Sequence, residues 1–157
     1  MHARSHLLAA AVALFLVTQH AAAAEPMKLP PLKKQASVQK VIDEHLDALN
    51  KCDWNRLMAQ YPNDVEIHLP DGVVIKGREK VGELFTGFCK ARPDGLKGLK
   101  FTAESSFVVG NTVNAMWRAE ADFLTEPYKG SDAYDTRDGL MAAQVTTFDG
   151  AKLKFKK

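Results

Sequence analysis

The stretch VNAMWRAEADF, residues 113–123, carries the clearest structural signal in the chain, because its side chains alternate with a period of two. Alternate residues of a β-strand point to opposite faces of a sheet, so this pattern predicts a long strand with one apolar face. That face carries, in order, Val113, Ala115, Trp117, Ala119, Ala121 and Phe123. The residues between them are predicted to face solvent or a partner: Asn114, Met116, Arg118, Glu120 and Asp122.

The apolar face of this strand also alternates in size, because three alanines surround the large ring of Trp117. A sheet face in a two-layer core usually carries larger aliphatic side chains, since protein interiors are filled to a high density. Two interpretations stay open. Side chains from a helix fill the space over the alanines, or an apolar cavity remains there.

Further strands are predicted on both sides of this one in the sequence. Upstream, residues 99–107 alternate up to a turn at Gly110-Asn111, which places Phe101 and Phe107 on one face. Downstream, Gly130 marks a loop, and strands are predicted over 132–137 and 140–148. The C-terminal half is therefore predicted to consist of four strands.

The N-terminal half shows helical periodicity, interrupted by one hairpin. Apolar residues recur at three- and four-residue spacings over 38–50, behind Ser37 as an N-cap, and again over 78–89. A short second helix is predicted over 53–58, and a hairpin over 65–76. The order of two helices, two strands, one helix and four strands indicates an α+β fold with a mostly antiparallel sheet.

The first 24 residues fit a cleavable secretory signal peptide, with Arg4 before an apolar run and with Ala22 and Ala24 at the exit. The run is too short to span a bilayer, so we expect no membrane association after cleavage and a periplasmic or secreted protein. Residues 25–36 are predicted to form a flexible leader, residues 37–150 one domain, and residues 151–157 a basic tail.

Composition argues against several classes of function. The chain of 157 residues has a formal net charge of +2, which falls to +1 without Arg4, so we expect no nucleic-acid partner. Phosphate-binding and nucleophile-elbow motifs are absent from the sequence. With two cysteines and, after cleavage, two histidines, we expect neither a metal site nor a cofactor.

The two cysteines, Cys52 and Cys89, lie at the ends of two predicted helices. An oxidising compartment permits them to form a disulfide. Both also occupy apolar helix positions, where a free cysteine packs as a small hydrophobic residue. We expect two packed thiols, with the disulfide as the alternative.

Two stretches resemble a known superfamily: HLDALNKCDWNRLMAQYPNDVEIHLPDG at residues 45–72 and GREKVGELF at residues 77–85. They are similar to the nuclear-transport-factor-2-like superfamily, especially its ketosteroid-isomerase-like and polyketide-cyclase (SnoaL-like) branch, over residues 38–149. The resemblance implies a cone-shaped, highly curved sheet with three helices over its mouth, often dimeric through the sheet. Members include enzymes and plain binding modules, so the fold alone implies no reaction.

The isomerase branch uses a carboxylate base together with a tyrosine and a neutral aspartic acid that donate hydrogen bonds. By position, the resemblance places Leu69 where the base would stand, His45 in place of the tyrosine, and Asp132 on the aspartic acid. Leu69 cannot accept a proton, so the isomerase's own mechanism is not expected here.

Three residues remain as candidates for chemistry. His45 lies in the apolar stripe of the first helix, where it is either a general base or a core histidine with one hydrogen bond. Asp132 is either an acid in the cone or a surface carboxylate in a turn. Tyr134 shares the face of Asp132 and is either a second acid or ordinary pocket lining. The predicted pocket lining is Leu49, Ile67, Leu69, Phe85, Ala115, Trp117 and Ala119.

The leading functional expectation is an exported domain that binds a small apolar or aromatic ligand in the cone. One alternative is a lyase, isomerase or hydrolase that uses His45 and Asp132 as an acid–base pair on a small apolar carbonyl compound. Another alternative is a homodimeric interaction module with an inert cone.

Overall fold

The computed structural model describes residues 27–157, so the predicted signal peptide lies outside the described residues. The order of helices and strands is the predicted one. The elements are α1 (Val38–Lys51), α2 (Trp54–Met58), β1 (Glu66–His68), β2 (Val74–Lys76), α3 (Arg78–Phe88), β3 (Lys100–Val109), β4 (Thr112–Glu120), β5 (Tyr128–Arg137), β6 (Leu140–Phe148) and a 3-10 turn, η1 (Gly150–Lys152). Among residues 27–157, no helix is long and apolar enough to cross a membrane.

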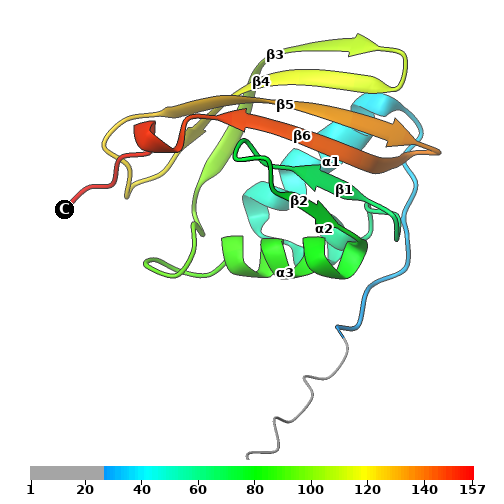
Figure 1. Ribbon diagram of the computed structural model, residues 1–157, viewed down its shortest axis with the longest axis horizontal. Helices are drawn as coiled ribbons and strands as arrows, with labels where there is room; N and C mark the ends of the chain where they lie inside the picture. Colours follow the sequence, from blue (N-terminus) through cyan, green and yellow to red (C-terminus); the bar gives the residue numbers. More distant parts are fainter. Residues whose placement is uncertain (1–26) are drawn as a thin grey trace, which may run out of the picture.

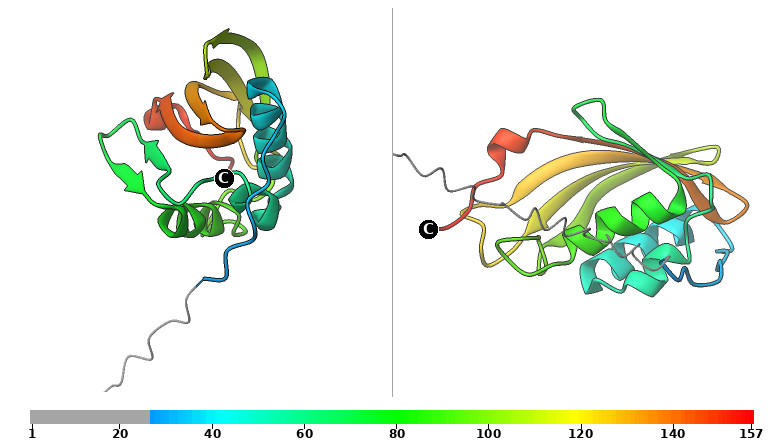
Figure 2. Two further views of the ribbon diagram at one scale, coloured as in Figure 1. Left: turned by 90° about the vertical axis from the view of Figure 1, so that its right-hand side faces the viewer. Right: turned by 60° about the horizontal axis from the view of Figure 1, so that its bottom comes forward.

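The six strands form one curved sheet in the order β2-β1-β6-β5-β4-β3. All neighbours are antiparallel except β1 and β6, which run parallel. The three helices lie on one side of this sheet, and the sheet curves around them (Figures 1 and 2). The predicted α+β fold with a curved, mostly antiparallel sheet is confirmed.

Helix α1 forms where the sequence places both a cap and an apolar stripe. The Ser37 hydroxyl accepts a hydrogen bond from the backbone N–H of Lys40 at 3.3 Å, as an N-cap does. The stripe turns Val41, Ile42 and Leu49 toward the sheet, where they are buried. His45 lies on the same stripe and is carried into the interior with them.

The alternation in β3 is interrupted by a β-bulge, which the sequence analysis missed. The register shifts between Ala103 and Ser105, so one extra residue of β3 faces a single residue of β4. Phe101 therefore faces inward, whereas Phe107 lies on the outer face with 62% of its surface exposed. The prediction that both rings share a face is wrong for this reason. Strand β4 is also shorter than predicted, because the chain turns after Glu120.

Gly130 lies inside β5 and not in a loop, because β5 begins at Tyr128. In the sheet register Gly130 stands opposite Trp117. A Cβ atom on Gly130 would overlap the Trp117 indole and would lie 2.7 Å from the carbonyl oxygen of Thr147. Glycine at this position thus makes room for the indole on the inner face of the sheet.

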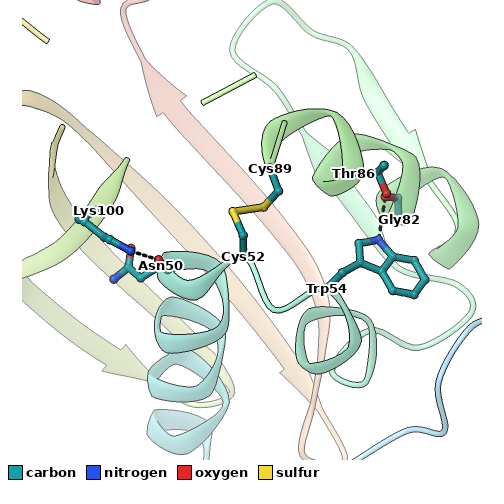
Figure 3. Close-up of a disulfide and its surroundings, with 7 residues drawn as sticks. All are labelled: Asn50, Cys52, Trp54, Gly82, Thr86, Cys89 and Lys100. Carbon is teal, nitrogen blue, oxygen red and sulfur yellow. Dashed lines mark hydrogen bonds between the residues drawn. A yellow bond between two sulfur atoms is a disulfide. The ribbon is translucent and has the colours of Figure 1, made fainter. Parts of the chain in front are cut away.

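Cys52 and Cys89 form a disulfide, with their Cα atoms 5.6 Å apart, and the expectation of two packed thiols is wrong (Figure 3). The bond joins the C-terminal end of α1 to the C-terminal end of α3, which meet only in the folded chain. Nearby, the Trp54 indole N–H donates to the carbonyl of Gly82 at 3.1 Å and fastens α2 to α3 (Figure 3). The three helices are therefore held together beneath the sheet.

The N-terminal segment, residues 27–36, is extended and held against the domain, which differs from the flexible leader predicted for it. The backbone N–H of Lys33 donates to the carbonyl of Ala59 at 2.8 Å. The buried guanidinium of Arg78 donates to the carbonyls of Pro30 and Met58 at 2.5 and 2.6 Å. Arg78 therefore ties this segment to α2 and to the start of α3.

The C-terminal segment after β6 also packs back on the domain. The backbone N–H of Lys156 donates to the carbonyl of Phe123 at 2.9 Å. The guanidinium of Arg92 stacks over the ring of Phe155 at 4.1 Å, a cation–π contact. The predicted basic tail thus pairs antiparallel with the chain that links β4 to β5, through a bridge between Leu124 and Phe155.

Candidate functional site

A cavity of about 300 Å³ lies between the inner face of the sheet and helices α1 and α3. Most of its lining consists of leucine and phenylalanine side chains. The polar or polar-tipped lining residues are His45, Trp117, Tyr128, Asp132, Tyr134, Gln144 and Thr146. An apolar hollow with a few polar groups is the usual form of a small-molecule site.

Five of the seven predicted lining residues line this cavity: Leu49, Ile67, Leu69, Phe85 and Trp117. Ala115 and Ala119 are buried but do not line it. Ala115 lies in the main core with Val41 and Ala48 of α1, so helix side chains fill the space over it. Ala119 packs in a second cluster with Leu99 and Tyr128. The cavity and the helix packing thus occur together, at different places on the same sheet face.

His45 is almost fully buried, with 1% of its surface exposed. Its Nδ1 lies 3.2 Å from the Tyr61 hydroxyl, and the rings of Phe85 and Tyr134 lie at centroid distances of 6.1 and 5.5 Å. Burial lowers the pKa of His45 from its ordinary 6.5 to about 4, because the charged imidazolium is poorly solvated there. His45 is therefore a neutral imidazole near neutral pH.

Asp132 lies in β5 with its carboxyl group in the cavity, so its placement in a surface turn is excluded. Its Oδ2 accepts hydrogen bonds from the Tyr134 hydroxyl at 2.7 Å and from Gln144 Nε2 at 3.3 Å. Burial raises the pKa of Asp132, while the surrounding polar groups of Thr146, Tyr134, Trp117 and Gln144 act in the opposite direction.

Two buried tyrosines, Tyr134 in the cavity lining and Tyr61 outside it, each lie beside one of the candidate residues. Tyr61 pairs with His45, and Tyr134 pairs with Asp132. Burial raises the pKa of both phenols well above the ordinary value, and the nearby Asp132 adds to this, so both hydroxyls stay protonated. No hydrogen bond joins His45 to Asp132 among the described residues. The predicted acid–base pair is therefore brought into one cavity but not into direct contact.

A family model for the SnoaL-like domain matches residues 42–144 of the chain. The chain belongs to the SnoaL-like family. The nuclear-transport-factor-2-like superfamily predicted from the sequence is thereby confirmed. No curated protein matches the chain.

Solved structures place this SnoaL-like domain in a broad fold group. An NTF2-like protein of unknown function from Cytophaga hutchinsonii is 17% identical, with a TM-score of 0.61, covering 76% of this chain and 96% of its own. A putative ketosteroid isomerase from Kribbella flavida is 18% identical (TM-score 0.60; 71% of this chain, 77% of its own). A computationally designed 17-OHP binder is 20% identical, with a TM-score of 0.63, covering 76% of this chain and 96% of its own. At these identities the likeness shows the fold alone.

Sequence reasoning missed two polar residues of the SnoaL-like site, Gln144 and Thr146, on β6. In the sheet register they stand opposite Tyr134 and Asp132. The signal that could have found them is their period-two spacing with Phe148, which also lines the cavity. Residues 27–157 hold no group of three or more His, Cys, Asp or Glu side chains arranged to bind a metal ion.

Proposed function

We propose that this SnoaL-like domain is an exported protein that binds a small apolar or aromatic ligand with one polar group. The observation that carries the proposal is the apolar cavity of about 300 Å³ with Asp132 on its wall. This volume is at the lower end of the range for small-molecule sites, which suits a compact ligand. The signal-peptide pattern of residues 1–24 supports export. The designed 17-OHP binder indicates that this fold can hold a small molecule.

Binding is better supported than acid–base catalysis. The catalytic alternative needs His45 and Asp132 to exchange a proton through a substrate or one bridging group. Instead, His45 is held by Tyr61, and Asp132 is held by Tyr134. A histidine with a pKa of about 4 is also a weak base at neutral pH.

Blocking the cavity should abolish binding. We expect a neutral fluorescent probe, N-phenyl-1-naphthylamine, to bind the wild-type protein saturably and with one site per chain. In Leu69→Trp an indole enters the cavity wall, and the affinity should fall by about tenfold or more. Fluorescence titration measures the number of binding sites and the affinity of each variant.

The matched control is Val109→Trp, since Val109 is exposed at the end of β3 and its replacement should leave the affinity unchanged. Calorimetric and thermal-shift screening of further apolar compounds extends the test. If no apolar compound binds or stabilises the wild-type protein, the proposed function is wrong.

We also propose that the outer face of the sheet is a homodimer surface. Phe107 on β3, Met116 on β4 and Val145 on β6 are exposed, the latter two at 53% and 48%. The sheet register puts all three on the face opposite the cavity. Exposed apolar side chains gathered on one face are typical of an interaction surface.

The dimer proposal predicts that Met116→Lys turns a dimer into a monomer, because it places a charge among apolar side chains. Light scattering over a concentration series measures the mass. Val73→Lys, in the exposed turn between β1 and β2, is the control that should remain dimeric. A wild-type protein that is monomeric at every concentration would contradict the proposal.

A further inference from the structure

The cavity reaches the surface beside the C-terminal segment, residues 149–157, which follows β6 (Figure 1). Most of the residues that line the cavity are buried or half-buried, whereas Phe148 and Gly150 are exposed. Phe148 is the last residue of β6, and Gly150 begins the 3-10 turn η1. Leu153, further along the same segment, also lines the cavity. The C-terminal segment therefore forms one side of the mouth of the cavity.

The loop that follows α3, residues 89–99, forms part of the other side of the mouth. Leu96 of this loop lines the cavity and packs, like Leu153, against the cluster around Trp117. Arg92 of the same loop places its guanidinium over the ring of Phe155, 4.1 Å from the ring centroid. Because one partner comes from each side, this cation–π contact spans the mouth.

The two sides of the mouth are fastened to the domain with unequal strength. The α3 side is held by the disulfide to α1 and by the hydrogen bond that the Trp54 indole donates to α3. The C-terminal segment is joined to the chain that links β4 to β5 by two backbone hydrogen bonds, at Lys154 and Lys156, and by an exposed ion pair. All its residues except the half-buried Leu153 are exposed. Segments with few buried contacts open at a lower free energy than the core, so the C-terminal segment is the side that can move.

We propose that the C-terminal segment is the gate through which ligands enter and leave the cavity, and that the Arg92–Phe155 contact is its latch. The inference rests on the proposed binding function and adds a control of ligand exchange at the same site. In the closed form Leu153 completes the wall of the cavity. In the open form the segment moves away from the mouth, and the rate of this opening sets the rate of exchange.

A latch affects binding differently from a residue of the cavity wall. Neither Arg92 nor Phe155 lines the cavity, so their contact forms in the closed protein with or without a ligand. Weakening it increases the population of the open form, and ligands then enter and leave faster by the same factor. The equilibrium affinity does not change, because the free and bound proteins lose the same contact.

Stopped-flow fluorescence with N-phenyl-1-naphthylamine measures the association and dissociation rate constants. Arg92→Met removes the charge and keeps an aliphatic stem, and both rate constants should rise by about threefold, the size expected for an exposed cation–π contact. The dissociation constant should stay within about twofold of the wild-type value. Phe155→Ala should raise both rate constants at least as much. Adding Arg92→Met to Phe155→Ala should then change neither rate constant further, because the two side chains act as one contact.

The opposite change should lock the gate. Leu124 and Phe155 form an antiparallel bridge with a hydrogen bond on each side of it, which makes them a non-hydrogen-bonded pair. Opposite side chains are closest in such a pair, so Leu124→Cys combined with Phe155→Cys should form a disulfide. Peptide mapping detects the new bond beside the native one. Both rate constants should then fall by about tenfold, and wild-type rates with the new bond in place would overturn the inference.

Arg137→Met is the matched control for Arg92→Met, because Arg137 is an exposed arginine at the end of β5 that pairs with Asp64. Both of its rate constants should equal those of the wild-type protein. Unchanged rate constants in Arg92→Met and Phe155→Ala would overturn the inference while the binding function stands. Faster dissociation without faster association would also overturn it, since the segment would then be a fixed wall. Failure of the wild-type protein to bind the probe or any other apolar compound would overturn the proposed function itself.

Discussion

Reducing the Cys52–Cys89 disulfide should lower the midpoint of thermal unfolding by roughly 10–15 °C. The bond closes a loop between residues 37 positions apart, and such a loop restricts the unfolded chain. The loop-closure relation gives a loss of about 4 kcal/mol from the free energy of unfolding when the bond is removed. The bond also joins α1 to α3, the two helices that enclose the cavity.

The effect can be measured by calorimetry with and without dithiothreitol, which reduces the disulfide to two thiols. Cys89→Ala should unfold at the midpoint of the reduced wild-type protein, and dithiothreitol should not lower it further. Cys89 is the simpler residue to replace, because its φ of −84° is one that alanine adopts readily, whereas Cys52 has a φ of 50°. If the midpoint of the wild-type protein does not change while mass spectrometry finds two free thiols, the disulfide does not stabilise the fold.

The burial of His45 should make stability depend on pH between about 4 and 6.5. In the unfolded chain the histidine has its ordinary pKa of 6.5, and in the fold its pKa is about 4. Between these values the unfolded chain binds a proton that the folded chain does not bind, so protonation favours unfolding. Above pH 6.5 His45 is mainly neutral in both the folded and the unfolded chain, so it does not lower the free energy of unfolding there. As the pH drops to 4, the free energy of unfolding should fall by about 3 kcal/mol.

Asp132 acts in the opposite direction as the pH rises above its ordinary pKa of 3.8. Because its pKa is raised in the fold, its contribution is fully present below its ordinary pKa of 3.8 and is lost as the pH rises through the folded value. Comparing the wild-type protein with His45→Gln separates the two residues, since Asp132 is common to both.

Urea unfolding at a series of pH values should therefore give a steeper loss of stability toward low pH in the wild-type protein than in His45→Gln. His68→Gln is the control for removing an imidazole, because His68 lies on the outer face beside Glu66. Parallel curves for the wild-type protein and His45→Gln between pH 4 and 6.5 would show that His45 is not buried as a neutral group.

The fold was largely predictable because each element carries a local signal. Ser37 and the stripe behind it define α1, and the alternation around Trp117 defines β4. The bulge in β3 was not predictable, because the small and polar residues Ala103 to Ser106 fit either face of a sheet. Gly130 resembles a loop residue in the sequence, and only its pairing with Trp117 explains a glycine within a strand.

The candidate site was predictable as a set of residues but not as a network. Strand and helix periodicity place His45, Asp132 and Tyr134 on faces that meet in the cavity. Which of them share a hydrogen bond depends on the register of β5 with β6 and on the position of Tyr61, and no local pattern encodes either. The disulfide escaped prediction for the same reason, since the distance between its cysteines is set by the packing of both α1 and α3 against α2.

The parallel pairing of β1 with β6 has a consequence for the order in which the domain assembles. Strands β3 to β6 follow one another as antiparallel neighbours, so they can pair through contacts that are close in sequence. Residues 66–68 of β1 must instead find residues 143–145 of β6, a distant contact that forms slowly. Ile67, which comes from β1, lines the cavity. We therefore expect the cavity to form late in folding. A ligand should then bind the folded domain and should not speed the early folding steps.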